Sequence, residues 1–314
     1  MKILIGYDGS RCSEAAIDDL QRAGLPPEGE AHILSVAEVW LHPQSGVENG
    51  NGKPDPYIEG VLRRQREKGE RALAEAQTFA KHAEKRIAAI LPRWKVTSSA
   101  TYGSPAWELI NKADEIKPDL ITVGSHGQSA ITRFFLGSIS QKVLTESSCS
   151  VRIARGRIEI DPSPIRIVIG FDSSRGAMAA VDSVAARNWP DETEVCLLSV
   201  TDPITPTAIG RFVPPIADTM EEINEAERVW LQQLADAAIE KLKSAGCSVT
   251  FDIRAGNPKK ILAEEAEHWN ADCIFVGANA FGSRLERFLI GSTSAAVAAR
   301  AHCSVEIVRI PTDE

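Results

Sequence analysis

The sequence predicts an α/β protein of two doubly wound parallel five-stranded sheets, each with helices on both faces, packed together as an internal pseudo-dimer. Two observations lead to this prediction. The segment ILIGYDGSRCSEAAID at residues 3–18 is answered by IVIGFDSSRGAMAAVD at residues 167–182. Within each copy, apolar runs alternate with segments of helical periodicity, and right-handed crossovers then leave few topologies other than a parallel sheet. The 314 residues are enough for two such units.

The elements of the first copy follow from its hydrophobic pattern. A near-continuous apolar run predicts a strand at 2–8, and the next helix is expected to begin at Ser13 and end at Gly24. The long segment 58–90 has apolar residues at helical spacing. Further strands are expected at 31–39, 95–103, 119–125 and 150–155, and further helices at 105–116 and 138–148. The second copy repeats this order through strands at 193–200, 247–256, 273–279 and 304–309.

The repeat also predicts the domain boundaries. One domain is expected at residues 1–156 and the other at 165–314, joined by a linker at about 157–164 that contains two prolines. Each copy closes with a short apolar strand, which would leave unpaired backbone groups at a sheet edge, so we expect the two closing strands to meet. The segment 41–56 reads as a surface loop over the carboxyl ends of the strands, either a passive connection or a substrate lid.

Composition excludes several classes of protein. The chain has 43 acidic and 35 basic residues and a net charge of -8, which argues against a general nucleic-acid or anionic-membrane surface. The N-terminus has no signal-peptide pattern, and no apolar run approaches the roughly 18 residues that span a bilayer. We therefore expect a cytoplasmic protein. Its six cysteines form no C-x-x-C pair and are expected to be buried free thiols.

Glycines follow two of the predicted strands and recur at the start of a helix. The sequence GYDG at residues 6–9 ends the first strand, GSHG at residues 124–127 ends the fourth, and Gly137 precedes the helix that begins at Ser138. Ligands of open parallel sheets bind at the carboxyl ends of the strands, and helix N-termini favour anions. Either loop alone could be an ordinary strand-to-helix turn. Because both recur in the second copy, we expect them to hold a phosphate group.

The same loops lack the residues of several enzyme classes. The chain has no P-loop lysine motif, no G-x-G-x-x-G after the first strand, no G-x-S-x-G elbow and no metal-spaced histidine pair. The loops also supply no obvious general base and no pair of acids for a metal. An ATP-consuming enzyme is therefore an alternative to a binding protein, with at most slow hydrolysis. A pure interaction protein that has lost its ligand is a second alternative.

The pattern Gly124-x2-Gly127-x9-Gly137-Ser138, after a first strand ending at Asp8, resembles the nucleotide-binding signature of the universal stress protein family. The resemblance extends to the segments IGYDGS, SVAEV and SCSVRIAR and covers nearly the whole chain twice. It implies two fused family domains with an adenine nucleotide alpha hydrolase-like fold. It further implies that the protein is a stress-response regulator that binds ATP, together with any Mg²⁺ held through the phosphates. The bound ATP would control the conformation of the protein or its binding to an unidentified protein partner. The resemblance also makes a homodimer of the two-domain chain an expected assembly.

The resemblance assigns adenine and ribose contacts and phosphate contacts to named residues of the first copy. The candidates are Gly6, Tyr7, Asp8 and Val36 for adenine and ribose, and Gly124, His126, Gly127, Gly137, Ser138, Ile139 and Ser140 for the phosphate side. Asp8 either holds ribose hydroxyls or caps the following helix. His126 either touches the ligand or faces solvent.

The second copy carries a modified version of this site. Its candidates are Asp172, Val200, Gly277, Gly282, Gly291, Ser292, Thr293 and Ser294. Ala280 stands where the first copy has Gly127, and one residue is added before Gly291. A Cβ at a position that favours glycine and a shifted loop both remove phosphate contacts, so we expect this site to be weaker or empty unless Gly282 replaces the missing glycine.

Overall fold

The computed structural model describes residues 1–39, 56–126, 136–155, 163–201, 214–278 and 290–310. The first half of the chain contains β1 (Lys2–Gly6), α1 (Arg11–Asp19), η1 (Leu20–Arg22), β2 (Glu30–Ala37), α2 (Pro56–Ile90), β3 (Lys95–Tyr102), α3 (Pro105–Ile116), β4 (Leu120–Gly124), α4 (Ser138–Glu146) and β5 (Ser150–Ala154). The second half contains β6 (Arg166–Gly170), α5 (Arg175–Ala185), β7 (Glu194–Thr201), α6 (Pro214–Ser244), β8 (Ser248–Ala255), α7 (Pro258–His268), β9 (Cys273–Gly277), α8 (Ser292–Arg300) and β10 (Ser304–Val308).

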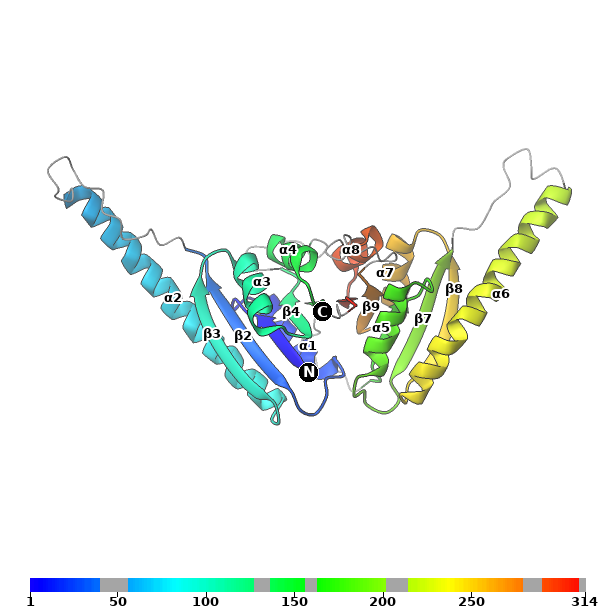
Figure 1. Cartoon of the computed structure of the whole chain (residues 1–314), viewed down its shortest axis with the longest axis horizontal. Helices are drawn as coiled ribbons and strands as arrows, with labels where there is room; N and C mark the ends of the chain where they lie inside the picture. Colours follow the sequence, from blue (N-terminus) through cyan, green and yellow to red (C-terminus); the bar gives the residue numbers. More distant parts are fainter. Residues whose placement is uncertain (40–55, 127–135, 156–162, 202–213, 279–289, 311–314) are drawn as a thin grey trace.

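The predicted doubly wound fold is confirmed, and its two halves are joined edge to edge. The strand order is β3-β2-β1-β4-β5-β10-β9-β6-β7-β8, so the two expected five-stranded sheets form one ten-stranded sheet (Figure 1). Every pairing within a half is parallel, whereas β5 and β10 pair antiparallel. The expected meeting of the two closing strands is therefore present, and it turns two sheet edges into buried ladder partners.

The strand order reverses once in each half. In the first half, the chain moves from β1 outward to β2 and β3 and then returns to β4, which lies on the other side of β1. In the second half, the chain moves from β6 outward to β7 and β8 and then returns to β9, which lies on the other side of β6. The carboxyl ends of β1 and β4, and of β6 and β9, therefore flank a switch point where a ligand can enter.

One face of the sheet carries a core that both halves share. Its buried side chains include Val151 and Ile153 of β5 and Val305 and Ile307 of β10. The opposite face has two separate cores, one of which contains Ile17 of α1 and the other Val181 of α5. The long helices α2 and α6 lie at opposite ends of the molecule and project beyond the sheet (Figure 1).

Matching contacts across the junction give the two halves an approximate twofold symmetry. Arg155, just after β5, donates from Nη2 to the carbonyl oxygen of Ala298 in α8 at 2.7 Å. Arg309, just after β10, donates in the same way to Leu144 of α4 at 3.0 Å. Each arginine therefore binds the last turn of a helix in the other half, where carbonyl groups lack intrahelical partners.

The first helix shows one local difference from the sequence prediction. It begins at Arg11 rather than Ser13, because Ser10 is the N-cap and its Oγ accepts a hydrogen bond from the Ser13 N–H at 3.2 Å. It ends at Asp19 and continues as a short 3-10 turn before Gly24, whose φ of +61° favours glycine.

Candidate functional site

The first candidate site is a cavity of about 440 Å³ at the carboxyl ends of β1, β2 and β4. It brings together most of the predicted residues of the first copy. Its wall contains Gly6, Tyr7, Asp8, Val36, Gly124, His126, Ile139 and Ser140. Gly137 and Ser138 lie at the start of α4, directly before Ile139. Gly127 lies outside the described residues.

Asp8 organises the turn between β1 and α1. Its Oδ1 accepts a hydrogen bond from the Ser10 N–H at 3.0 Å, and Ser10 in turn caps α1. Asp172 makes the same 3.0 Å contact with Ser174 in the second half. The structure therefore supports the turn-capping role of both aspartates, and both side chains also line their cavities.

The glycines at the ends of β4 and β9 have a structural reason of their own. A Cβ on Gly124 would lie 2.8 Å from the carbonyl carbon of Cys12, and a Cβ on Gly277 would lie 2.4 Å from that of Gly176. Both contacts are shorter than van der Waals packing allows. These glycines therefore let the first turn of α1 or α5 approach the adjacent strand, which the sequence-based assignment to phosphate alone had missed.

The helices α4 and α8 begin at the two sites without a side-chain cap. Their N-cap residues are Gly137 and Gly291, and neither offers a side-chain hydrogen bond to the first turn. Each helix is held in place by a serine: Ser140 Oγ donates to the Gly124 carbonyl at 2.7 Å, and Ser294 Oγ to the Gly277 carbonyl at 2.6 Å. The serine hydroxyl protons are therefore used in the fold, while the N–H groups of the first turn stay available to a ligand.

Tyr7 is fixed against the wall of the first cavity. Its hydroxyl donates to Glu14 Oε1, and Arg86 of α2 pairs with the same carboxylate. Burial raises the pKa of Tyr7, against the opposing effect of Arg86. The second half has Phe171 at this position, so it lacks this link between strand and long helix.

His126 is partly buried rather than solvent-facing. Its Nδ1 lies 3.0 Å from Ser125 Oγ, and its buried Nε2 has no hydrogen-bond partner among the described residues. Burial, followed by the charge of Arg155, lowers the pKa of His126 and keeps the ring neutral near pH 7. A neutral ring nitrogen in the cavity wall can accept or donate a hydrogen bond to a ligand.

Several residues of the first cavity were not among the predicted ligand contacts. They are Ser13, Leu34, Ser35, Ala37, Glu38, Ala72, Glu75, Ala76, Phe79, Pro105, Leu109 and Val123. Ala76 and Phe79 belong to the apolar stripe of the long helix, but that pattern indicates a core face and gives no sign of a cavity. The Oγ of Ser35 is buried without a hydrogen-bond partner among the described residues, whereas the equivalent Ser199 donates to the Phe171 carbonyl at 2.6 Å.

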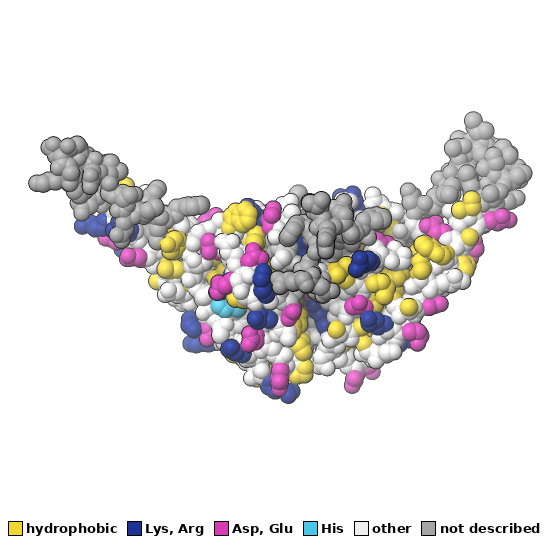
Figure 2. Space-filling view, viewed as in Figure 1, with side chains coloured by type: hydrophobic (Ala, Val, Ile, Leu, Met, Phe, Trp, Pro, Cys, Tyr) yellow, Lys and Arg dark blue, Asp and Glu magenta, His cyan; other side chains and the backbone are white. Residues whose placement is uncertain are grey.

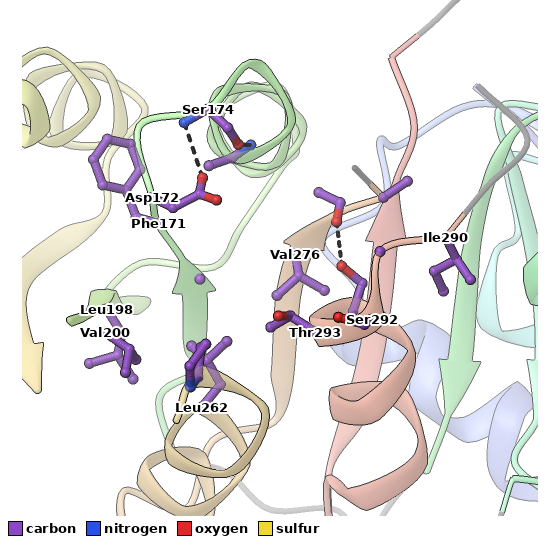
Figure 3. A pocket seen from close by; sticks show the side chains of 17 residues that line it. Phe171, Asp172, Ser174, Leu198, Val200, Leu262, Val276, Ile290, Ser292 and Thr293 are labelled. Carbon is purple, nitrogen blue, oxygen red and sulfur yellow. Dashed lines mark hydrogen bonds between the residues drawn. The ribbon is translucent and has the colours of Figure 1, made fainter. Parts of the chain in front are cut away.

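The second candidate site is a cavity of about 410 Å³ in the equivalent place (Figure 3). Its wall contains the predicted residues Asp172, Val200, Gly277, Gly291, Ser292, Thr293 and Ser294. Gly282 and Ala280 lie outside the described residues. Figure 3 shows Asp172 and Ser174 on one side of the space, Ser292 and Thr293 on the other, and Leu198, Val200 and Leu262 along its apolar side.

The two cavities differ in charge and in walls. Asp8, Glu38 and Glu75 line the first, whereas Asp172 supplies the single charged side chain among the described residues of the second. The long helix α2 contributes four side chains to the first cavity, but no described residue of α6 reaches the second.

Within the described ranges, no group of three or more His, Cys, Asp or Glu side chains is arranged to hold a metal ion. No helix within those ranges is both long and apolar enough to cross a bilayer.

Comparison with known proteins identifies the relatives of this chain. The family model of the universal stress protein family matches it twice, at residues 1–155 and 165–309. A universal stress protein of Mycolicibacterium smegmatis is 25% identical over 321 residues, covering 98% of this chain and 96% of the relative. Universal stress protein YxiE of Bacillus subtilis is 31% identical over 154 residues, covering 49% of this chain and 98% of the relative.

A solved structure matches the arrangement of both halves. The crystal structure of a universal stress protein from Archaeoglobus fulgidus aligns with 100% of this chain and 97% of its own, at a TM-score of 0.56 and 23% sequence identity. At this identity the likeness supports the fold. Because the family model covers both repeats, the chain belongs to the universal stress protein family and carries its domain twice.

Proposed function

We propose that each half binds an adenine nucleotide at the carboxyl edge of the sheet, and that the bound ATP controls the conformation or protein partners of a stress-response regulator. Family membership and the two cavities at the switch points support this proposal. In it, residues 1–156 and 165–314 are the two nucleotide-binding domains of a cytoplasmic protein, joined by the linker at about 157–164.

The observation that carries the proposal is the bare start of α4 and α8. Among the helices that follow a strand, α1, α5 and α7 have their first turn capped by the side chains of Ser10, Ser174 and Asn257. The helices α4 and α8 have glycine at the N-cap instead, whereas α3 has Ser104, which makes no side-chain hydrogen bond to its first turn. A phosphate group would accept hydrogen bonds from these uncapped N–H groups and would gain from the helix dipole.

The remaining contacts divide between the two sides of the cavity. Adenine and ribose would lie against Gly6, Tyr7, Asp8 and Val36, and the phosphates against Gly124, Gly127, Gly137, Ser138, Ile139 and Ser140. His126 and Ser35, whose hydroxyl has no hydrogen-bond partner among the described residues, add polar groups on the wall. Three carboxylates and no Lys or Arg line the described part of the first cavity, so a nucleotide accompanied by Mg²⁺ suits it better than a bare polyphosphate.

We further propose that the sites are unequal, with the first binding more tightly. Four side chains of α2, those of Ala72, Glu75, Ala76 and Phe79, line the first cavity, and α6 adds none in the described part of the second. A ligand in the first site would therefore gain packing against the long helix. The altered Gly277–Gly291 loop acts in the same direction, since it replaces a glycine and adds a residue.

Titration of the full chain with ATP and Mg²⁺ by calorimetry tests this proposal. Wild type should show one tighter and one weaker site. Gly137 has φ -62° and ψ 152°, which valine adopts without strain, so the Gly137→Val side chain would act by occupying the phosphate space and should abolish the tighter site. The matched Gly291→Val should abolish the weaker one.

Thermal unfolding of each variant controls for misfolding. Undiminished ATP affinity in folded Gly137→Val would overturn the phosphate assignment. Two equally tight ATP sites in the wild type would overturn the proposal that the first site binds more tightly. Mass spectrometry of nucleotide released from the purified chain identifies the natural ligand.

A further inference from the structure

The helices α4 and α8 begin at the two cavities, and the last turn of each is bound by an arginine of the opposite half. Both helices have nine residues and lie near the middle of the molecule (Figure 1). The Leu144 carbonyl of α4 accepts a hydrogen bond from Arg309 Nη2 at 3.0 Å. The Ala298 carbonyl of α8 accepts one from Arg155 Nη2 at 2.7 Å. Leu144 and Ala298 occupy the same place in their helices, and the two arginines directly follow β5 and β10, so the contact is repeated in both directions.

The backbone of each arginine is also fixed by the opposite half. The Arg155 N–H donates to Ser304 Oγ at 2.9 Å, and the Arg309 N–H donates to Ser150 Oγ at 3.1 Å. Both serines begin the closing strand of the other half. The buried Arg309 side chain donates from Nη2 to the Thr145 carbonyl as well, at 3.4 Å. A buried cation needs acceptors and the last carbonyls of a helix need donors, so the arginine and the helix end hold each other in place.

The opposite end of each helix carries the N–H groups that would face a phosphate. Ser140 Oγ and Ser294 Oγ attach this end to the neighbouring strand. A short helix that is attached at both ends cannot tilt, so the contact in its last turn also fixes the direction of its first-turn N–H groups. The helix α4 has no basic residue in its own last turn, and Arg309 supplies a positive charge there from the other half.

Surface charge gives little help in holding a phosphate on the face shown in Figure 2. Lys and Arg side chains are scattered among Asp and Glu on this face rather than gathered in one patch. The described wall of the first cavity contains three carboxylates and no Lys or Arg. Attraction of a phosphate to this cavity therefore depends on the start of α4, and so on the contacts that keep α4 in position.

We propose that Arg309 is a positioning residue of the first nucleotide site and that Arg155 is a positioning residue of the second. Each site is then completed by a residue from the other half of the chain. This inference rests on the proposed nucleotide binding at both cavities. Neither arginine lines the cavity whose helix it binds, so each acts through the helix and not by contact with the ligand. Antiparallel pairing of β5 with β10 is what brings each arginine to the helix of the other half.

Calorimetric titration of full-length variants with ATP and Mg²⁺ tests one site at a time. In Gly291→Val, where the first site should remain, the added change Arg309→Met should weaken ATP binding about tenfold, because it removes a charged donor from the end of α4. In Gly137→Val, where the second site should remain, Arg155→Met should weaken binding by a similar factor. Each arginine variant should weaken the site of its own half less. Arg309→Lys keeps the charge without the planar fork and should recover part of the affinity.

Arg187→Met is the matched control for a loss of stability alone. Arg187 also donates across the junction, from Nη1 to the Ala23 carbonyl at 2.8 Å. That carbonyl follows α1 and η1, and the first turn of α1 is capped by Ser10. The control should lower the unfolding midpoint and leave the ATP affinity of the first site within about twofold of wild type.

Amide hydrogen exchange of the ligand-free chain gives a second readout that does not depend on nucleotide. Arg309→Met should speed exchange in residues 138–146, whereas Arg187→Met should not. Unchanged ATP affinity in folded Gly291→Val/Arg309→Met would overturn the positioning role, and so would unchanged exchange in α4. A wild type that binds no ATP would overturn the proposed function instead, and the exchange rates would then still decide whether Arg309 holds α4.

Discussion

Arg152 of β5 lies directly opposite Glu306 of β10 in the antiparallel pairing that joins the two halves. Both side chains are fully buried, and Arg152 Nη1 donates to Glu306 Oε2 at 3.2 Å. The same arginine donates from Nε to Asp19 Oδ2 at 2.5 Å, and Arg187 pairs with Glu306 on the other side. The two residues occupy the same position in the two repeats, so an exact repeat would have buried two like charges at the centre of the junction.

This pairing predicts a large loss of stability when its central cation is removed. Arg152→Met leaves the carboxylates of Asp19 and Glu306 buried with less compensation, which should cost about 3–5 kcal/mol of unfolding free energy. The urea unfolding midpoint of the full chain measures the loss. Lys241→Met is the control, because its pair with Asp182 is half exposed and should cost at most about 1 kcal/mol. Equal effects of the two variants would contradict a special role for the junction.

The close approach at Gly277 predicts that a side chain at this position destabilises the fold. A Cβ there would lie 2.4 Å from the backbone of Gly176, so Gly277→Ala must displace α5 and should cost about 1–3 kcal/mol. Gly60→Ala is the matched control: no atom lies within 4 Å of its added Cβ, and alanine in a helix should stabilise by roughly 0.5–1 kcal/mol. Thermal unfolding compares the two; a neutral Gly277→Ala would show that α5 yields without cost.

Two partly buried thiols, those of Cys149 and Cys196, predict a loss of stability at alkaline pH. Burial raises the pKa of Cys149 and of Cys196 from 9.0 to about 11. The unfolded chain therefore releases these protons first, so their contribution is complete below about pH 9 and is lost as the pH rises toward 11. Unfolding midpoints across this range should fall more steeply for wild type than for Cys149→Ala/Cys196→Ala. Parallel curves would contradict the raised pKa values.

His126 predicts a pH dependence of nucleotide binding, on the condition that phosphate lies beside it as proposed. Its pKa is lowered in the free protein, chiefly by burial, so the ring is neutral near pH 7. A bound anion favours the imidazolium form and raises that pKa, and ATP should therefore bind more tightly as the pH falls from 7 toward 5.5. Calorimetry should compare the ATP affinity of wild type and His126→Gln across this pH range. The affinity of the variant should rise less as the pH falls, because glutamine does not titrate. The same slope in both proteins would place the phosphate elsewhere.

Much of the fold could be predicted from the sequence because it depends on local patterns. The expected helix at 105–116 matches α3, since Pro105 begins it and its apolar spacing is regular. Most of the predicted residues of the first site also lie together around one cavity, because parallel strands bring their carboxyl ends to one edge of the sheet. The misplaced start of α1 arose because two serines, Ser10 and Ser13, could each cap it, and only the backbone geometry selects Ser10.

The sequence by itself determined the repeat, the doubly wound topology and the positions of the glycine loops, because these depend on order and spacing along the chain. Only the tertiary structure decided which distant residues meet. Asp19, Arg152 and Glu306 come from three separate segments, and α2 lines the first cavity whereas no described residue of α6 lines the second. Such contacts depend on how elements far apart in sequence pack in space. Hydrophobic periodicity shows which face of an element is buried, but it does not show which side chains of another element that face will contact.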